Sequence, residues 1–200
     1  MSSFVYLASQ SPRRRQLLEQ LGVRYELLLP DADEDAEALE AVLVNEAPAS
    51  YVRRVTGLKL DAAVARLKRR KLLAAPVLCS DTTVAMGRAI YGKPENTKDA
   101  VRMLTELSGA THRVLTAIAV QSGRRRFDAL STSRVSFDAM TAAQIRSYVA
   151  TGESMGKAGA YAIQGKVAQY ISHISGSYSG IMGLPLRETA LLLGSAGIKI

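Results

Sequence analysis

The fold class is indicated by one stretch near the beginning of the chain, residues 4–22, which reads FVYLASQSPRRRQLLEQLG. Its apolar start, Phe4–Ala8, predicts a buried strand. Ser11 and Pro12 then predict a helix start, with Ser11 as N-cap and Pro12 at the first helical position. Leucines lie on one face of this helix, and Gly22 ends it. A strand that leads directly into a helix is typical of α/β proteins.

The rest of the 200-residue chain continues this alternation. The pattern predicts further strands at 23–29, 77–85, 112–121, 126–137, 159–164 and 167–174. It predicts helices at 48–74, 97–107, 141–152 and 185–193, with a weak point in the long helix near Thr56-Gly57. The acidic stretch 30–47 is expected to be a loop with some helical character. We therefore expect an α/β protein with a mixed sheet flanked by helices.

Composition excludes several classes of protein. Hydrophobic residues make up 48% and charged residues 22% of the chain, which is ordinary for a globular domain or two small lobes with a shared core. A single cysteine, Cys79, and two histidines exclude a disulfide framework and a Cys-rich zinc site. The sequence shows no targeting segment and no apolar run long enough to span a membrane, so we expect a cytoplasmic protein.

Charge is unevenly spread along the chain. Residues 25–52 contain eight acidic residues and no Lys or Arg, and the remainder carries 26 basic against 10 acidic residues. A basic body with one acidic segment suits a polyanionic partner, with the acids holding a divalent metal against it. An acidic surface loop on a basic protein explains the same pattern, and charge alone does not separate the two interpretations.

The segment between the first strand and the first helix is a candidate anion site. Free backbone N–H groups and the positive end of the helix dipole meet at such a corner. Ser9 and Ser11 offer hydroxyl donors, and Arg13 and Arg14 offer guanidinium forks that match phosphate. The alternative is a capped helix with a solvated arginine run.

Carboxylates form the second group of candidates. Asp81 follows Val77, Leu78 and Cys79 in an apolar strand, where a carboxylate must be paired, hydrogen-bonded or metal-bound. It suits a general base or a Mg²⁺ ligand. An Asp that merely begins a turn is the less favoured alternative, because Val77, Leu78 and Val84 indicate a core strand. Asp33-Glu34 in the acidic loop is suited to sharing a hard cation with a triphosphate.

Three separated lysines, Lys59, Lys93 and Lys157, are each placed to reach a phosphate as a point charge. The spacing around Gly156-Lys157 departs from a Walker P-loop, and no dinucleotide-binding glycine motif is present. His112 and His173 are given no catalytic role.

Taken together, these segments resemble the Maf family of nucleotide pyrophosphatases. The matching segments occur in the right order over nearly the whole chain. They are Leu7–Arg14, Asp33-Glu34, Tyr51–Arg54 with Lys59, Ser80–Val84, Gly92–Pro94, Met103–His112, Lys157–Gly165, Gly176–Tyr178 and Gly183–Leu186. The sequence departs from the family pattern at Thr56-Gly57 and at Lys166–Ala168.

The resemblance implies a two-lobed α/β fold similar to that of inosine triphosphate pyrophosphatases (the Maf/Ham1 fold), formed by residues 1–200 as one domain with a cleft between its lobes. It implies cleavage between the α- and β-phosphates that depends on Mg²⁺ or Mn²⁺, and often a homodimer. Asp81 matches the family's proposed proton acceptor. Arg14, Thr82 and Gln164 match the positions that distinguish the dTTP/UTP branch.

We therefore predict an enzyme that hydrolyses dTTP and UTP to the monophosphate and pyrophosphate. In this hypothesis Asp81 is catalytic, and Glu34 and Asp81 hold the divalent metal. The predicted substrate-binding residues are Ser9, Arg13, Arg14, Lys59, Thr82, Lys93, Lys157 and Gln164. We expect a small-molecule nucleotide partner, no membrane and no nucleic acid. The alternatives are a basic nucleic-acid-binding module without catalysis and a non-catalytic regulator of cell division.

Overall fold

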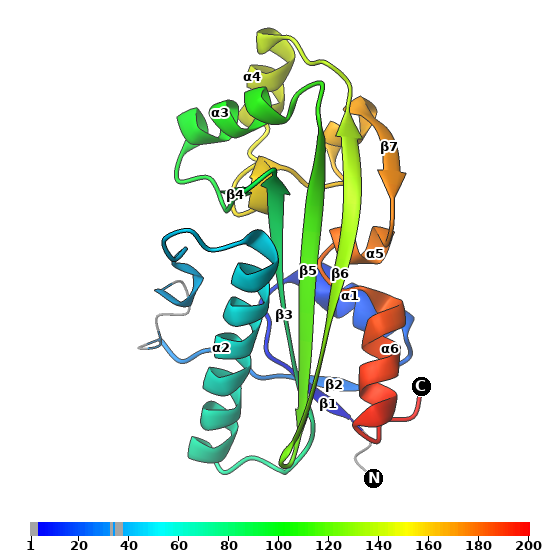
Figure 1. Ribbon diagram of the computed structural model, residues 1–200. Coiled ribbons are helices and arrows are strands. Elements are labelled where there is room, and N and C mark those ends of the chain that lie inside the picture. The colour runs from blue at the N-terminus through cyan, green and yellow to red at the C-terminus, as the bar shows by residue number, and fades with distance from the viewer. Residues whose placement is uncertain (1–3, 33, 35–37) are drawn as a thin grey trace.

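The computed structural model describes residues 4–32, 34 and 38–200, and these contain a mixed sheet of seven strands (Figure 1). The strand order is β2-β1-β3-β5-β6-β7, with β4 paired to β3 outside this path. β1 is parallel to β2 and β3, and the other pairs are antiparallel. The predicted mixed sheet flanked by helices is confirmed. The strands are β1 (Val5–Leu7), β2 (Tyr25–Leu27), β3 (Val77–Met86), β4 (Ala89–Tyr91), β5 (Thr111–Ser122), β6 (Arg125–Phe137) and β7 (Ile171–Ser175).

Helices cover both faces of the sheet, and the alternation of side chains along β3 shows which helix lies on which face. Cys79 packs with Leu60 of α2 in one apolar cluster. Leu78 points the other way and packs with Leu18 of α1 and Leu193 of α6. The α-helices are α1 (Pro12–Gln20), α2 (Pro48–Arg69), α3 (Thr97–Leu107), α4 (Ala142–Ala150), α5 (Tyr178–Ile181) and α6 (Leu186–Ser195).

A separate apolar cluster lies at the upper end of the sheet in Figure 1, under α3 and α4. Leu104 of α3 and Tyr148 of α4 pack there with Val135 of β6. The long strands β5 and β6 run from this cluster to the lower one, so one sheet joins both ends of the molecule (Figure 1). The assignment of residues 1–200 to one two-lobed domain stays a prediction.

The long helix α2 runs without interruption through the predicted weak point at Thr56-Gly57. The Thr56 hydroxyl donates to the Val52 carbonyl one turn earlier, 2.8 Å away. The Gly57 carbonyl accepts from Arg126 Nη2 at 2.9 Å, and a Cβ on Gly57 would lie 3.5 Å from that nitrogen. That distance is an ordinary van der Waals contact, so the arginine packs against the helix at this point. The helix ends at Arg69, five residues before the predicted end at 74.

The predicted strands at 159–164 and 167–174 are wrong for most of their length. The chain forms the 3-10 turns η2 (Ala158–Ala160) and η3 (Lys166–Tyr170) there, and within this stretch only Ile171–Ser175 pairs as a strand. Gly159 has a φ of +69°, which an extended strand does not allow. Tyr161, Ile163 and Val167 of this stretch each pack into the cluster under α3 and α4 from the turns. Their spacing in the sequence resembles the alternation of a strand.

The short helix α5 was not predicted, although Ser177 caps it by accepting a hydrogen bond from the Gly180 N–H. The predicted capping box of α4 at Thr141 and Gln144 is confirmed. A third 3-10 turn, η1 (Ala38–Glu40), provides the expected helical character of the acidic stretch.

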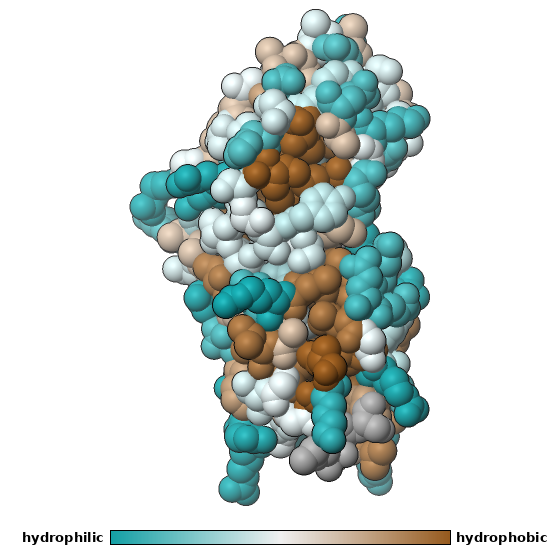
Figure 2. All heavy atoms as spheres, turned by 90° about the vertical axis from the view of Figure 1, so that its right-hand side faces the viewer, coloured by the Kyte–Doolittle hydropathy of each residue, from teal (hydrophilic) through white to brown (hydrophobic). Residues whose placement is uncertain are grey.

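The outer face of α6 carries an exposed apolar area, visible as brown atoms in Figure 2. Leu191 and Ile200 are more than half exposed there and border a shallow groove with Ile198. Within residues 4–32, 34 and 38–200, no helix has the length and apolar character needed to cross a membrane.

Candidate active site

The candidate site lies where one edge of β3 has no neighbouring strand among the described residues. On this edge, β3 pairs with β1 as far as Leu78 and with β4 from Val84 onward. Its other edge pairs with β5 from Val77 to Ala85. Residues 80–83 therefore present a gap between two strands, and the chain segments that leave β1 and β4 border it.

A cavity of about 660 Å³ occupies this gap, and residues from both ends of the chain line it. Every described residue of the predicted site lies on its wall: Ser9, Arg13, Arg14, Glu34, Lys59, Asp81, Thr82, Lys93, Lys157 and Gln164. Asp33 lies outside the described residues. The predicted cationic corner at the start of α1 and the predicted catalytic carboxylate on β3 thus share one cavity.

The corner at α1 is held together by Ser9 and Gly183. The Ser9 hydroxyl accepts from the Ser11 N–H at 3.2 Å and from Arg14 Nη1 at 3.1 Å, while Ser11 itself makes no side-chain cap. Arg14 Nε donates to the Gly183 carbonyl at 2.9 Å, and Ser80 donates to the same oxygen at 2.9 Å. Burial lowers the pKa of the Arg14 guanidinium, against the opposing effect of Asp81. The arginine is therefore fixed in direction beside the cavity.

Asp81 and Lys59 form the centre of the opposite wall. Asp81 is buried on the face of β3 that meets α2, and its Oδ1 lies 2.6 Å from Lys59 Nζ. Burial by itself lowers the pKa of Lys59, but Asp81 and Glu40 outweigh this effect and raise it. The Glu40 carboxylate lies 2.8 Å from Lys59 Nζ and 3.0 Å from Lys93 Nζ. Positive and negative groups alternate along this wall.

Thr82 points to the opposite face of β3 from Asp81, because successive side chains of a strand alternate. Its hydroxyl lies 2.9 Å from that of Thr116, which donates to the Gly180 carbonyl of α5. A Cβ on Gly183 would lie 3.3 Å from Arg14 Nε and 3.5 Å from Thr82 Oγ1. The cavity therefore wraps around the open edge of β3, with an Asp81 side and a Thr82 side.

Glu34 has two guanidinium partners. Arg66, a buried residue of α2, approaches it at 2.5 Å, and Arg69 approaches its other oxygen at 2.5 Å. Arg66, followed by Arg69, lowers the pKa of this carboxyl to about 2. Glu34 lies on the cavity wall, and its role as a metal ligand stays a prediction.

The segment that carries Lys157 and Gln164 closes the cavity from the upper end. The Gly159 N–H donates to the Gly92 carbonyl next to Lys93, which ties this segment to the end of β4. Tyr161 lies between the two predicted residues, and its hydroxyl is 2.8 Å from His112 Nε2. Burial lowers the pKa of His112 to about 4.

Sequence reasoning missed Glu40 and the support provided by Gly183 and Ser80. Glu40 is one of eight acids in the stretch 25–52, and nothing in its neighbourhood singles it out. Gly183 stands in a segment that resembles the family, but its role depends on a carbonyl oxygen, which every residue has. His112, to which we assign no catalytic role, lies 2.8 Å from the Tyr161 hydroxyl through its Nε2.

A family model and curated relatives both match this chain over nearly its whole length. A family model described as Maf-like protein matches residues 4–196. A dTTP/UTP pyrophosphatase of Polaromonas sp. (strain JS666 / ATCC BAA-500) is 73% identical over 199 residues, which cover all of this chain and 98% of the relative. A dTTP/UTP pyrophosphatase of Albidiferax ferrireducens is 70% identical over the full length of both chains.

Among solved structures, the Ham1 protein of Staphylococcus aureus aligns with 66% of this chain and 71% of its own, at a TM-score of 0.39 and 14% identity. The family model and the full-length relatives are the decisive findings. Because the family model matches residues 4–196 and the relatives match the full chain, including every residue on the cavity wall, the chain belongs to the Maf family.

Proposed function

We propose that this protein hydrolyses dTTP and UTP to the nucleoside monophosphate and pyrophosphate. The observation that carries the proposal is the shared cavity, which brings the cationic corner at α1 and the buried carboxylate of Asp81 together at the open edge of β3. The relatives named dTTP/UTP pyrophosphatase, at 70–73% identity, support the same activity. Neither the family nor these relatives favour the alternative of a nucleic-acid-binding module.

The polyphosphate binds between the two walls of the cavity. Ser9, Arg13 and Arg14 provide hydrogen bonds and positive charge at the start of α1, where the helix dipole also favours an anion. Lys59, Lys93 and Lys157 add point charges from the other sides. These cations stabilise the negative charge that develops on the departing pyrophosphate.

Asp81 orients and deprotonates the attacking water. The water oxygen forms a bond to the α-phosphorus, the bond from that phosphorus to the bridging oxygen of the β-phosphate breaks, and pyrophosphate leaves. Lys59 donates to Asp81 Oδ1 at 2.6 Å and fixes the position of the carboxylate. The water proton passes to Asp81 and then to solvent.

The proposal includes a divalent cation, for which the cavity wall offers the carboxylates of Asp81 and Glu34, now paired with Lys59 and with two arginines. Mg²⁺ is usually held by one or two carboxylates together with substrate phosphates, and Asp81 and Glu34 are the carboxylates predicted to hold it. When bound, such a cation neutralises charge on the phosphate oxygens. Among the described residues, no group of three or more His, Cys, Asp or Glu side chains provides a metal site made of protein ligands alone.

The base lies on the Thr82 side of the strand, away from Asp81. Thr82, Arg14 and Gln164 line this part of the cavity, and the carbonyl of Gly183 fixes the direction of Arg14. Gln164 is exposed and offers both a donor and an acceptor to a pyrimidine edge. The open edge of β3 thus separates phosphate chemistry from base recognition.

The central experiment compares Asp81→Asn with Asp128→Asn. Asp128 is an exposed carboxylate of β6 that pairs with Arg53 outside this cavity. We expect Asp81→Asn to lower turnover of dTTP about 100-fold or more, the scale of a lost general base. Asp128→Asn should keep wild-type turnover. The assay measures pyrophosphate and orthophosphate separately, and wild-type turnover in Asp81→Asn would remove Asp81 from the mechanism.

A cytoplasmic location and a homodimer complete the proposal. Light scattering of the purified protein measures its mass in solution and tests the second point. Salt-sensitive binding of oligonucleotides without pyrophosphate release would favour the nucleic-acid-binding alternative instead.

A further inference from the structure

Glu40 occupies the space between two of the cations assigned to phosphate binding. Its carboxylate accepts from Lys59 Nζ at 2.8 Å and lies 3.0 Å from Lys93 Nζ. Its side chain is 25% exposed at the cavity wall. A phosphate that accepts from the same N–H groups of both lysines takes the place of these carboxylate oxygens.

The Glu40 carboxylate and a bound phosphate compete for the same two lysines, because both are anions. Burial raises the pKa of Glu40, but Lys59 and Lys93 outweigh this effect and lower it, so the group is ionised at neutral pH. An ionised carboxylate repels a phosphate from the same two lysines. Lys59 keeps a second partner in Asp81, 2.6 Å away, after Glu40 leaves.

We propose that Glu40 is a resident anion that bridges Lys59 and Lys93 in the free enzyme and that the polyphosphate of the nucleotide displaces it. The inference rests on the proposed function, because it deepens the description of the same phosphate site. It makes Glu40 a residue that determines affinity: only a ligand that engages both lysines replaces both of its contacts. A single phosphate that reaches one lysine does not.

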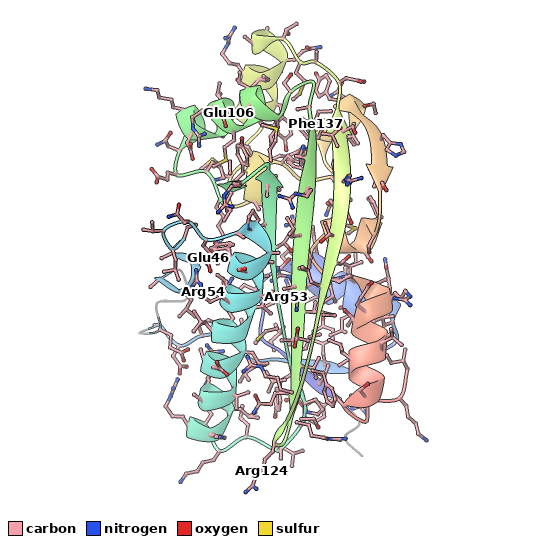
Figure 3. All side chains as sticks on the ribbon, in the orientation of Figure 1. Glu46, Arg53, Arg54, Glu106, Arg124 and Phe137 are labelled. Atoms are coloured by element: carbon pink, nitrogen blue, oxygen red, sulfur yellow. The ribbon has the colours of Figure 1, made fainter. Side chains whose placement is uncertain are left out.

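The backbone around Glu40 is held by residues of α2, so the proposed displacement requires only the side chain to move. The Glu40 carbonyl accepts from the Tyr51 hydroxyl at 2.9 Å, and the Ala41 carbonyl accepts from Arg54 Nη2 at 2.8 Å. Arg54 also forms a two-point pair with Glu46, and both residues lie at the upper part of α2 in Figure 3. Tyr51 and Arg54 of α2 thus hold the backbone at residues 40 and 41.

Displacement has a measurable consequence for binding. When only a fraction of molecules is free to bind, the apparent dissociation constant is the intrinsic one divided by that fraction. Removal of the Glu40 charge takes one anionic partner away from each of the two lysines in every molecule. The expected gain is about fivefold, which corresponds to about 1 kcal/mol, the upper end for one partly exposed ion pair.

The test titrates pyrophosphate into the full-length protein by calorimetry, with chelator and without metal. Glu40→Gln keeps the size of the side chain and removes its charge, and it should bind pyrophosphate about fivefold more tightly than wild type. Glu46→Gln is the matched control, because it neutralises a carboxylate of the same segment whose hydrogen bonds within the described part of the chain go to Arg54 and the Leu43 N–H. It should bind as wild type does.

Unchanged or weaker binding in Glu40→Gln overturns the proposal. Weaker binding would show that Glu40 supports the phosphate site. If circular dichroism shows that Glu40→Gln does not fold, Glu40→Asp replaces it in the titration. The shorter side chain cannot bridge both lysines, so Glu40→Asp should bind pyrophosphate more tightly than wild type. Hydrolysis of dTTP by wild type, measured separately, tests the proposed function, so either claim can fail while the other stands.

Discussion

Burial of His112 predicts a loss of stability in mild acid. The imidazole is 1% exposed, contacts the rings of Phe137 and Tyr161, and bonds the Tyr161 hydroxyl through Nε2. Its Nδ1 has no hydrogen-bond partner among the described residues. Burial lowers its pKa from the usual 6.5 to about 4, because the charged form has no compensating anion there.

The sign and size of the effect follow from proton linkage. Between pH 6.5 and 4 the unfolded chain binds a proton at this position and the folded protein does not, so stability falls as pH falls. The difference between the two pKa values corresponds to about 3 kcal/mol in all, of which about 2 kcal/mol is lost between pH 7 and pH 5.

Urea unfolding followed by circular dichroism, at pH 7 and at pH 5, measures this loss. His112→Gln keeps a polar group near the Tyr161 hydroxyl without a charge that titrates, so its free energy of unfolding should vary about 2 kcal/mol less than that of wild type between these pH values. His173→Gln, at an exposed position of β7, should behave as wild type does. An equal pH dependence in wild type and His112→Gln would refute the reasoning.

Two further predictions concern the segment that closes the cavity. Gly159→Ala should destabilise the protein by about 1–3 kcal/mol, because Gly159 has a φ of +69° and an added Cβ would lie 2.9 Å from Val84; a melting temperature equal to that of wild type would contradict this. Gln164→Ala should leave stability unchanged, because the side chain is exposed, and should raise KM for dTTP and UTP by about 10-fold, the value of one neutral hydrogen bond. Steady-state kinetics on both nucleotides measures this, and an unchanged KM would remove Gln164 from base recognition.

Several elements of the fold were predictable because local physical chemistry determines them. The apolar run before Ser9 and the Pro12 start of α1 define a strand-to-helix corner with few alternatives. The Thr141 capping box, the β5–β6 hairpin and the apolar strand around Asp81 are equally local. The prediction failed between residues 159 and 170, where Tyr161 and Ile163 pack in the upper cluster with residues distant in the sequence.

The amino-acid sequence by itself determined which chemical groups the site contains: the serine and arginines at a helix start, the three separated lysines and an aspartate within an apolar strand. Only the tertiary structure decided how these groups face one another. The gap in the β3 edge arises because β1 stops pairing at Leu78 and β4 begins at Val84, and that is a property of three separate segments. Glu40 joins Lys59 and Lys93 for the same reason, because contacts across 19 and 53 residues of chain depend on the path of the backbone and have no signature in a local pattern.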